Sequence, residues 1–457
     1  MMNKLRILIV LLFSITIVSC QKNEFDKQRV DDKNVSGSQN FKTYYVSPSG
    51  NDASSGLSQS TPFRTFERAV SVTQPGDFVY FMDGSYIISK TISILTPGLP
   101  DNYITYAALA GAKPKFIAAG NIFDSININA SYIRIIGLEL QGNNANIIPS
   151  EALAAYNAVK AGGTPNGFFN TNGIAIGGPR TNSKLPHHVE VKDCIIHDFP
   201  GGGLGAIQAD YVTFEGNTVY NNAWYSIYGQ SGISILTPFN SDNSTGYKNI
   251  VRGNKCYGNK TTIPWIQVDR LSDGNGIIMD TNNREYNATS GTGYYTGRTL
   301  LENNVSFNNG GSGIHAFDFQ HADIVNNTTY NNGLVVGYGN IYASTATDCK
   351  IMNNIMYAKP GGRVNQRNNS GGANVIYSNN IYFLNGGPAP EVMGTNDKIA
   401  DPLFIALSAD PAFANFQLQA SSPAVNYGTS ALFAAKDFLG IARPKGTAPD
   451  CGAYESF

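Results

Sequence analysis

Four aspartates and one histidine lie between residues 269 and 318, and their types are those of a carboxylate site. Carboxylate oxygens bind calcium, and a carboxyl or imidazole group can act as a general acid or base. Asp280 is a candidate for both roles. The expected calcium ligands are Asp269, Asp273 and Asp280, and the expected catalytic residues are Asp280, His315, Arg284 and Asp318.

Basic and aromatic residues are gathered in the same part of the chain. Basic groups can bind the carboxylate of a ligand, and aromatic rings can stack on sugar faces. The candidate binding residues are Lys248, Trp265, Arg270, Tyr286, Tyr294, Tyr295, Arg298 and Phe317. Other roles stay open: Asp273-Gly-Asn-Gly276 also reads as a turn, and Arg284 and Lys248 also read as surface charges.

A repeated phrase indicates what positions these residues. Gly216-Asn217-Thr-Val-Tyr-Asn-Asn222 recurs as Asn303-Asn304-Val-Ser-Phe-Asn-Asn309, and weaker copies stand on either side. Of six spacings between successive copies, four lie between 23 and 27 residues. Short strands bounded by Gly and Asn at this period predict a parallel β-helix with about three strands per coil. Stacked asparagines are expected to form a hydrogen-bonded ladder.

The strand in each unit gives a register. Alignment on the first residue places Ile277 and Met279 inward and Asp280 outward, with His315 outward one coil later. Alternation along the strands therefore predicts that Asp280 and His315 are outward neighbours on successive coils. The segment 203–209 fits this register poorly and is left unassigned.

The N-terminus reads as an export signal. Twelve apolar residues follow Lys4 and Arg6, too few to span a bilayer but typical of a signal peptide. The run ends in Ile17-Val-Ser-Cys20, which resembles a bacterial lipobox with Cys20 as the lipidated residue; an ordinary signal peptide is the alternative. We therefore expect a lipoprotein of the cell envelope, anchored at the periplasmic or outer face of the outer membrane.

Composition narrows the class of protein. Charged residues make up 14% of the chain, against about 25% in typical proteins, and the net charge is −1. This argues against a nucleic-acid binder, and the 42% hydrophobic content argues against disorder. The four remaining cysteines form no C-x-x-C pair and are expected to be buried apolar residues; they are Cys194, Cys256, Cys349 and Cys451.

Three parts of the sequence carry a family resemblance. The front end contains Tyr44-Tyr-Val-Ser-Pro-Ser-Gly-Asn-Asp52 and Pro62-Phe-Arg-Thr-Phe, the middle contains the repeat, and the end contains Asp401-Pro-Leu-Phe404. Together they resemble the secreted right-handed parallel β-helix proteins of the pectate-lyase-like superfamily. The resemblance implies an all-β solenoid whose N-terminal cap includes a helix over residues 62–72.

The expected organisation follows from these parts. It comprises a signal peptide (1–19), a flexible tether (20–41), a cap with first coils (42–130), the β-helix with inserted loops (131–385) and a closing segment (386–457). We expect a monomer, held to the membrane only through its lipid.

The resemblance implies a polysaccharide or oligosaccharide partner and leaves three hypotheses. The first is a calcium-assisted polysaccharide lyase acting on a uronate-containing glycan, the second a glycoside hydrolase, and the third a glycan-binding lipoprotein without catalysis. The related family-nine pectate lyases carry a lysine base on a parallel strand. The matching strand here, Gly274 to Asp280, has Ile278 in the corresponding place.

Overall fold

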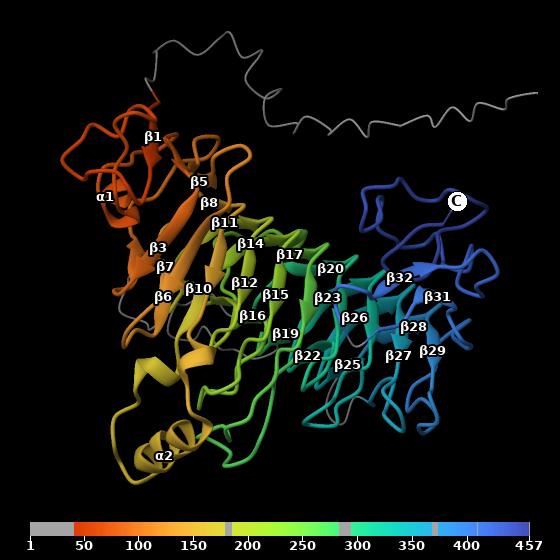
Figure 1. The fold of residues 1–457 in the computed structure, drawn as a ribbon. Coiled ribbons are helices and arrows are strands. Elements are labelled where there is room, and N and C mark those ends of the chain that lie inside the picture. The colour runs from red at the N-terminus through yellow and green to blue at the C-terminus, as the bar shows by residue number, and fades with distance from the viewer. Residues whose placement is uncertain (1–40, 179–184, 283–293, 368–372, 409, 457) are drawn as a thin grey trace, which may run out of the picture. The chain divides into compact units, whose positions relative to one another are not determined.

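The computed structural model describes residues 41–178, 185–282, 294–367, 373–408 and 410–456. Most strands belong to three parallel sheets, called A, B and C below. From β10 to β27 the chain passes through sheets C, A and B in turn, one strand in each, before the next coil begins (Figure 1). The predicted parallel β-helix with three strands per coil is confirmed.

Each sheet is formed by strands from successive coils. Sheet A contains, in spatial order, β1 (Thr43–Val46), β2 (Phe78–Phe81), β5 (Ile104–Ala108), β8 (Ile133–Ile136), β11 (His187–Lys192), β14 (Asp210–Glu215), β17 (Tyr247–Arg252), β20 (Arg298–Glu302), β23 (Gln320–Val325), β26 (Thr347–Met352) and β28 (Val375–Ser378). Sheet B contains β3 (Gly84–Ile88), β6 (Pro114–Ala118), β9 (Glu139–Gln141), β12 (Ile195–His197), β15 (Thr218–Tyr220), β18 (Lys255–Tyr257), β21 (Val305–Phe307), β24 (Thr328–Tyr330), β27 (Ile355–Tyr357), β29 (Ile381–Phe383) and β30 (Lys398–Ile399). Sheet C contains β4 (Ile92–Ile94), β7 (Asp124–Ile128), β10 (Asn172–Gly177), β13 (Leu204–Ile207), β16 (Ile233–Leu236), β19 (Ile277–Asp280), β22 (Ile314–Phe317) and β25 (Ile341–Ser344).

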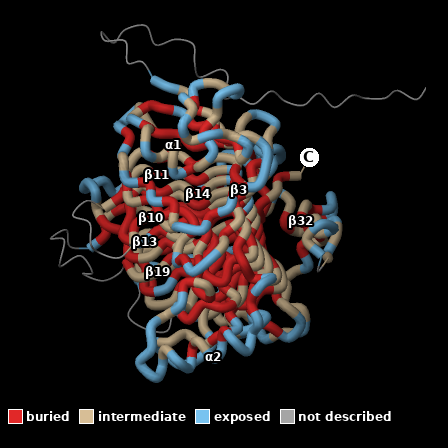
Figure 2. The backbone as a smooth tube through the Cα atoms, turned by 60° about the vertical axis from the view of Figure 1, so that its left-hand side comes forward, coloured by how far each residue is buried: buried red, intermediate tan, exposed pale blue. Residues whose placement is uncertain are grey.

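The core is a column of aliphatic side chains inside the coils. In sheet C, Ile233, Ile277 and Ile314 pair in register on successive strands, and all three are fully buried. Each such isoleucine stabilises the fold by about 1.5–3 kcal/mol relative to an exposed one. Figure 2 shows buried residues following the strands, while exposed residues gather in the turns and α2. The four described cysteines are buried and unpaired, as predicted.

Segment 203–209 belongs to the register after all. Its strand β13 turns Leu204 and Ala206 into the core and pairs with β10 and β16. The sequence pattern was weak there because Gly205 occupies an outward position and the inward pair is not Ile-x-Ile.

The capping helix is shorter than predicted. Helix α1 spans Phe66–Val70 rather than residues 62–72, because Phe63 forms a bridge with Val46 and the Thr65 side chain caps the first turn by accepting from the Arg68 backbone N–H at 3.1 Å. Phe66 packs its ring on Phe81 at 4.6 Å between centroids and thus helps to close the first coil.

A second helix, α2 (Pro149–Lys160), was not predicted. It lies in the insertion between β9 and β10, near the short 3-10 helices η2 (Asn144–Asn146) and η3 (Gly167–Phe169). Its signal was present in Pro149 at the first helical turn and in the alanine-rich run that follows. Buried Tyr156 packs in a cluster with Tyr225 and Ile263, so the helix joins the loops beside sheet C.

The chain ends against the outer face of sheet B. Strands β31 (Phe404–Ala406) and β32 (Asn415–Leu418) form a small antiparallel sheet. Phe416 lies 5.1 Å from Phe307 and 5.4 Å from Tyr330, ring centre to ring centre. This segment therefore covers aromatic side chains of the last coils.

Two asparagine ladders run through the turns, as predicted. Between sheets A and B, each rung donates a side-chain N–H to the carbonyl oxygen of the next rung at 2.9–3.1 Å; the rungs are Asn217, Asn254, Asn304, Asn327, Asn354 and Asn380. Asp397 accepts the last of these bonds. Between sheets B and C a shorter ladder contains Asn222, Asn259, Asn309 and Asn332.

Substitution of a central rung tests the ladder. Asn304 accepts from both the backbone N–H and the side chain of Asn254, so Asn304→Ala leaves two buried donors unpaired. We expect the free energy of unfolding to fall by about 2–4 kcal/mol in denaturant titration. The control Asn243→Ala, at an exposed loop position, should change it by less than about 0.5 kcal/mol. Equal effects would show that the ladder adds nothing.

Candidate functional site on the outer face of sheet C

The outer face of sheet C presents one row of side chains near the ends of its strands. In register across successive coils the row runs Ile207, Leu236, Asp280, Phe317 and Ser344. Asp280 thus lies between two apolar residues, one of them the partly exposed ring of Phe317 (38%). A carboxylate beside an exposed ring suits a sugar, which has both hydroxyls and an apolar face.

The predicted pairing of Asp280 with His315 is wrong. His315 occupies the second place in β22 and pairs with Ile278 and Tyr342, whereas Asp280 occupies the last place in β19 and pairs with Phe317. Both side chains alternate outward as expected, but they belong to neighbouring rows.

His315 is enclosed by aromatic rings. Its ring stacks on Tyr342 at 4.1 Å, and Phe317 and Tyr338 lie at 5.8 Å. Nδ1 is 3.3 Å from the Tyr342 hydroxyl, and Nε2 has no hydrogen-bond partner among the described residues. The side chain is 6% exposed, and burial lowers its pKa to about 3. The imidazole is therefore neutral at physiological pH, and its catalytic role stays a prediction.

Asp273 approaches the site from the loop that precedes β19. Its carboxylate accepts from the Ser272 hydroxyl at 2.8 Å and from Asn275 at 3.3 Å. Burial raises the pKa of Asp273 to about 7, and the charge of Asp280 acts in the same direction. The turn interpretation also holds, because Asp273 and Gly274 have φ values of 63° and 68°. The residue combines a turn with a carboxyl that titrates near neutral pH.

Asp269 is engaged elsewhere. Lys160 of α2 donates to it at 2.6 Å, and the Tyr156 hydroxyl also donates to it. It therefore ties the loop after β18 to helix α2. Across the described ranges no group of three or more His, Cys, Asp and Glu residues is arranged to hold a metal ion. Calcium bound by Asp269, Asp273 and Asp280 remains a prediction.

Lys248 and Tyr295 stabilise the interior of an inserted loop. Lys248 is 2% exposed and pairs with Asp210 at 3.2 Å and Asp242 at 2.9 Å. The Tyr295 hydroxyl donates to Asp210 at 2.8 Å and accepts from Asn249. Both side chains are buried, so their predicted contact with substrate stays a prediction.

The other predicted residues lie in the chain before and after the strands of sheet C rather than in one cluster. Trp265 and Arg270 form an antiparallel bridge in the loop before β19, with Arg270 exposed. Tyr294 is 54% exposed, and Arg298 forms ion pairs with two aspartates, described below. Asp318 is buried directly after β22, with φ 49°.

Several expectations fall outside the described residues. These are the roles of Arg284 and Tyr286 and the lipidation of Cys20. No helix in the described part of the chain is long and apolar enough to cross a membrane.

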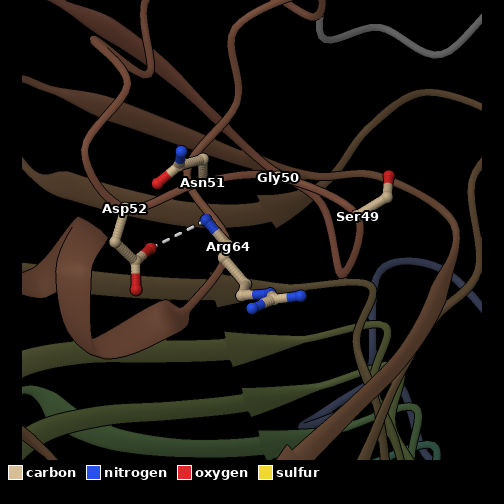
Figure 3. Close-up of a pocket in the computed structure, with 5 residues that line it drawn as sticks. All are labelled: Ser49, Gly50, Asn51, Asp52 and Arg64. Carbon is tan, nitrogen blue, oxygen red and sulfur yellow. Dashed lines mark hydrogen bonds between the residues drawn. The ribbon is translucent and has the colours of Figure 1, made fainter.

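A hollow of about 570 Å³ lies beside the N-terminal cap (Figure 3). Its lining includes Asp52, whose Oδ1 accepts from the backbone N–H groups of Arg64 at 2.8 Å and Thr65 at 2.9 Å. This carboxylate holds the start of α1, so its position is explained by folding.

Sequence reasoning missed a pair on sheet A, His321 and Asp348, with 2.7 Å between Nδ1 and Oδ2. Each is the second residue of its strand, in β23 and β26, one coil apart. The repeat also places these two residues at equivalent positions of successive coils, and this is the sequence signal that could have identified them.

The titration of Asp273 gives a stability prediction. Its pKa is about 7 in the fold against 3.8 ordinarily, so between these values the folded protein binds more protons than the unfolded chain. The free energy of unfolding contributed by this group therefore falls as pH rises from about 4 to about 7. In urea titrations, the free energy of unfolding of Asp273→Asn should rise relative to that of wild type by about 1 kcal/mol or more between pH 4 and pH 8, because the variant has no carboxyl to titrate. If the difference in the free energy of unfolding between wild type and variant did not change with pH, the raised pKa of Asp273 would be contradicted.

Comparisons with known proteins bear on the fold. A family model described as Pel9A-like, right handed beta helix region matches residues 44–161. The structure titled pectate lyase Pel9A is 17% identical, with a TM-score of 0.53 over 91% of this chain and 96% of that chain. A structure titled glycoside hydrolase is 8% identical, with a TM-score of 0.50 over 78% and 96%. No curated protein sequence matches significantly. The chain thus has the right-handed parallel β-helix fold that the resemblance implied, similar to the fold of that pectate lyase.

Proposed function

We propose that this protein is a carbohydrate-active enzyme, a polysaccharide lyase that cleaves a uronate-containing glycan by β-elimination. The observation that carries the proposal is that two carboxyl groups that interact electrostatically, Asp280 at the end of β19 and Asp273 in the loop before it, lie in this part of the molecule. Asp280 lies on the outer face beside the ring of Phe317, and nearby Asp273 has its pKa raised to about 7. Groups with a pKa near the working pH are the most effective proton-transfer catalysts.

The reaction needs few groups. A base removes the proton on the carbon next to the uronate carboxylate, the C–O bond to the neighbouring sugar breaks, and a carbon–carbon double bond forms. The departing oxygen takes up a proton. Ionised Asp273 is the proposed base, Phe317 supports the sugar ring, and exposed Arg270, in the same loop as Asp273, pairs with the substrate carboxylate. Likeness in fold to a pectate lyase along most of both chains supports this reading.

The structure also fits a glycoside hydrolase. That reaction uses two carboxyl groups, one protonated as the acid and one ionised as nucleophile or base. Asp273, whose pKa burial and the neighbouring Asp280 charge both raise, suits the acid, and Asp280 suits the second role. This pairing is the specific reason to keep the hydrolase as the second candidate.

The two reactions differ in product and in pH dependence. The lyase produces ultraviolet absorbance from the new double bond, and kcat/KM should rise as pH rises through about 7, because Asp273 must be ionised. The hydrolase releases reducing ends without that absorbance, and kcat/KM should fall through the same range. Asp280→Asn and Asp273→Asn should each reduce activity at least about 100-fold.

Matched controls decide the outcome. Asp410→Asn changes an exposed aspartate in the loop between β31 and β32 and should retain full activity. If a panel of uronate and neutral glycans shows neither product while binding persists, the protein is a non-catalytic glycan binder and the enzyme proposal fails. Calcium is tested in the same assay, since loss of activity with chelator and recovery with added calcium would support the predicted ligands.

Cys20 leads to a proposal about location. We propose that the mature chain begins at Cys20 and is held in the cell envelope by lipid on that residue, since the residues before it read as a signal peptide. Metabolic labelling with a fatty acid should mark the wild-type protein and not Cys20→Ser. Equal labelling of both, or of neither, would contradict the anchor.

A further inference from the structure

A polar hollow of about 560 Å³ lies over sheet A. It lies over the first residues of β20, β23 and β26, and residues directly before β17 and β20 complete it. Its lining is Thr245, Tyr294, Tyr295, Thr296, Arg298, Gln320, His321 and Asp348.

The polar groups of this hollow are held by one another. His321 Nδ1 lies 2.7 Å from Asp348 Oδ2, and Arg298 reaches the same carboxylate at 2.7 Å. Arg298 also pairs with Asp323, which is buried, at 2.9 Å. The side chains are therefore oriented before any ligand arrives, which reduces the entropy that binding costs.

The charges of the hollow select against anions. The single positive charge of Arg298 is opposed by two carboxylates, Asp323 and Asp348, both within 3 Å. A uronate carboxylate or a phosphate would find no uncompensated positive charge and would face Asp348. A neutral, hydroxyl-rich ligand meets both donors and acceptors here without that repulsion.

The His321 ring has different neighbours from the aromatic rings at the same strand position in earlier coils. There His188 is stacked between Tyr132 at 4.9 Å and Tyr211 at 4.3 Å. His321 has no such ring stacking among the described residues, because its neighbour along the column is Asp348. Its side chain is 35% exposed at the hollow, and the ring of Tyr294, 54% exposed, stands on the same lining.

We propose that this hollow is a second glycan subsite, which binds a neutral sugar unit through its hydroxyl groups. His321 and Asp348 take the hydroxyls, and Tyr294 stacks on the sugar ring. The subsite rests on the proposed function only in that the protein binds glycans.

Binding experiments on the full chain test the subsite. The probes are a panel of neutral oligosaccharides and oligogalacturonates, with Kd measured by isothermal titration calorimetry. Tyr294→Ala and His321→Ala should each weaken the best neutral ligand at least ten-fold. Phe413→Ala, another exposed aromatic far along the chain, should leave its Kd unchanged. Tyr294 is exposed, so its loss should not lower the melting temperature, which separates binding from folding.

The outcomes also distinguish this proposal from the enzymatic one. Asp280→Asn should abolish cleavage and leave neutral binding intact, so each claim can fail alone. If no neutral ligand binds, if the Tyr294 and His321 variants bind as wild type, or if oligogalacturonates occupy this hollow more tightly, the proposed subsite is overturned.

Discussion

Hydrogen bonds between the side chains of buried asparagines on successive coils set the register of this β-helix. In the ladder from Asn217 to Asn380, each amide donates to the next side chain, and the last donates to Asp397. Loss of register would leave several amides unpaired in an apolar interior, at about 1–3 kcal/mol each. Because side chains alternate along a strand, a slip of one residue would turn Asp280 inward. The ladder therefore fixes the outer face of sheet C as well as the core.

The repeating part of the structure could be predicted from the sequence. The repeated asparagine motif predicted the length of one coil, and the Ile-x-Ile pattern predicted the inward positions. Both patterns recur several times along the sequence. The prediction failed where the pattern was weak, as at Gly205 in β13, and in the pairing between coils, since Asp280 pairs with Phe317 and not with His315.

The inserted segments were much less predictable. The burial of Lys248 and the attachment of Asp269 to Lys160 depend on how loops fold on other coils. Nothing repeats in those loops, so composition showed that charged and aromatic residues gather there but not which ones face solvent. The low charge of the chain, 14%, made the cluster visible, yet several of its charges serve to hold the loops.

The proposed chemistry depends most on the Asp273 carboxyl in the loop before β19, because burial and, in the same direction, the charge of Asp280 raise its pKa to about 7. The most direct measurement is a pH titration of the Asp273 carboxyl by carbon-13 NMR, in wild type and in Asp280→Asn. We expect a midpoint near pH 7 in wild type and a lower one in the variant. A midpoint near pH 4 in wild type would contradict it.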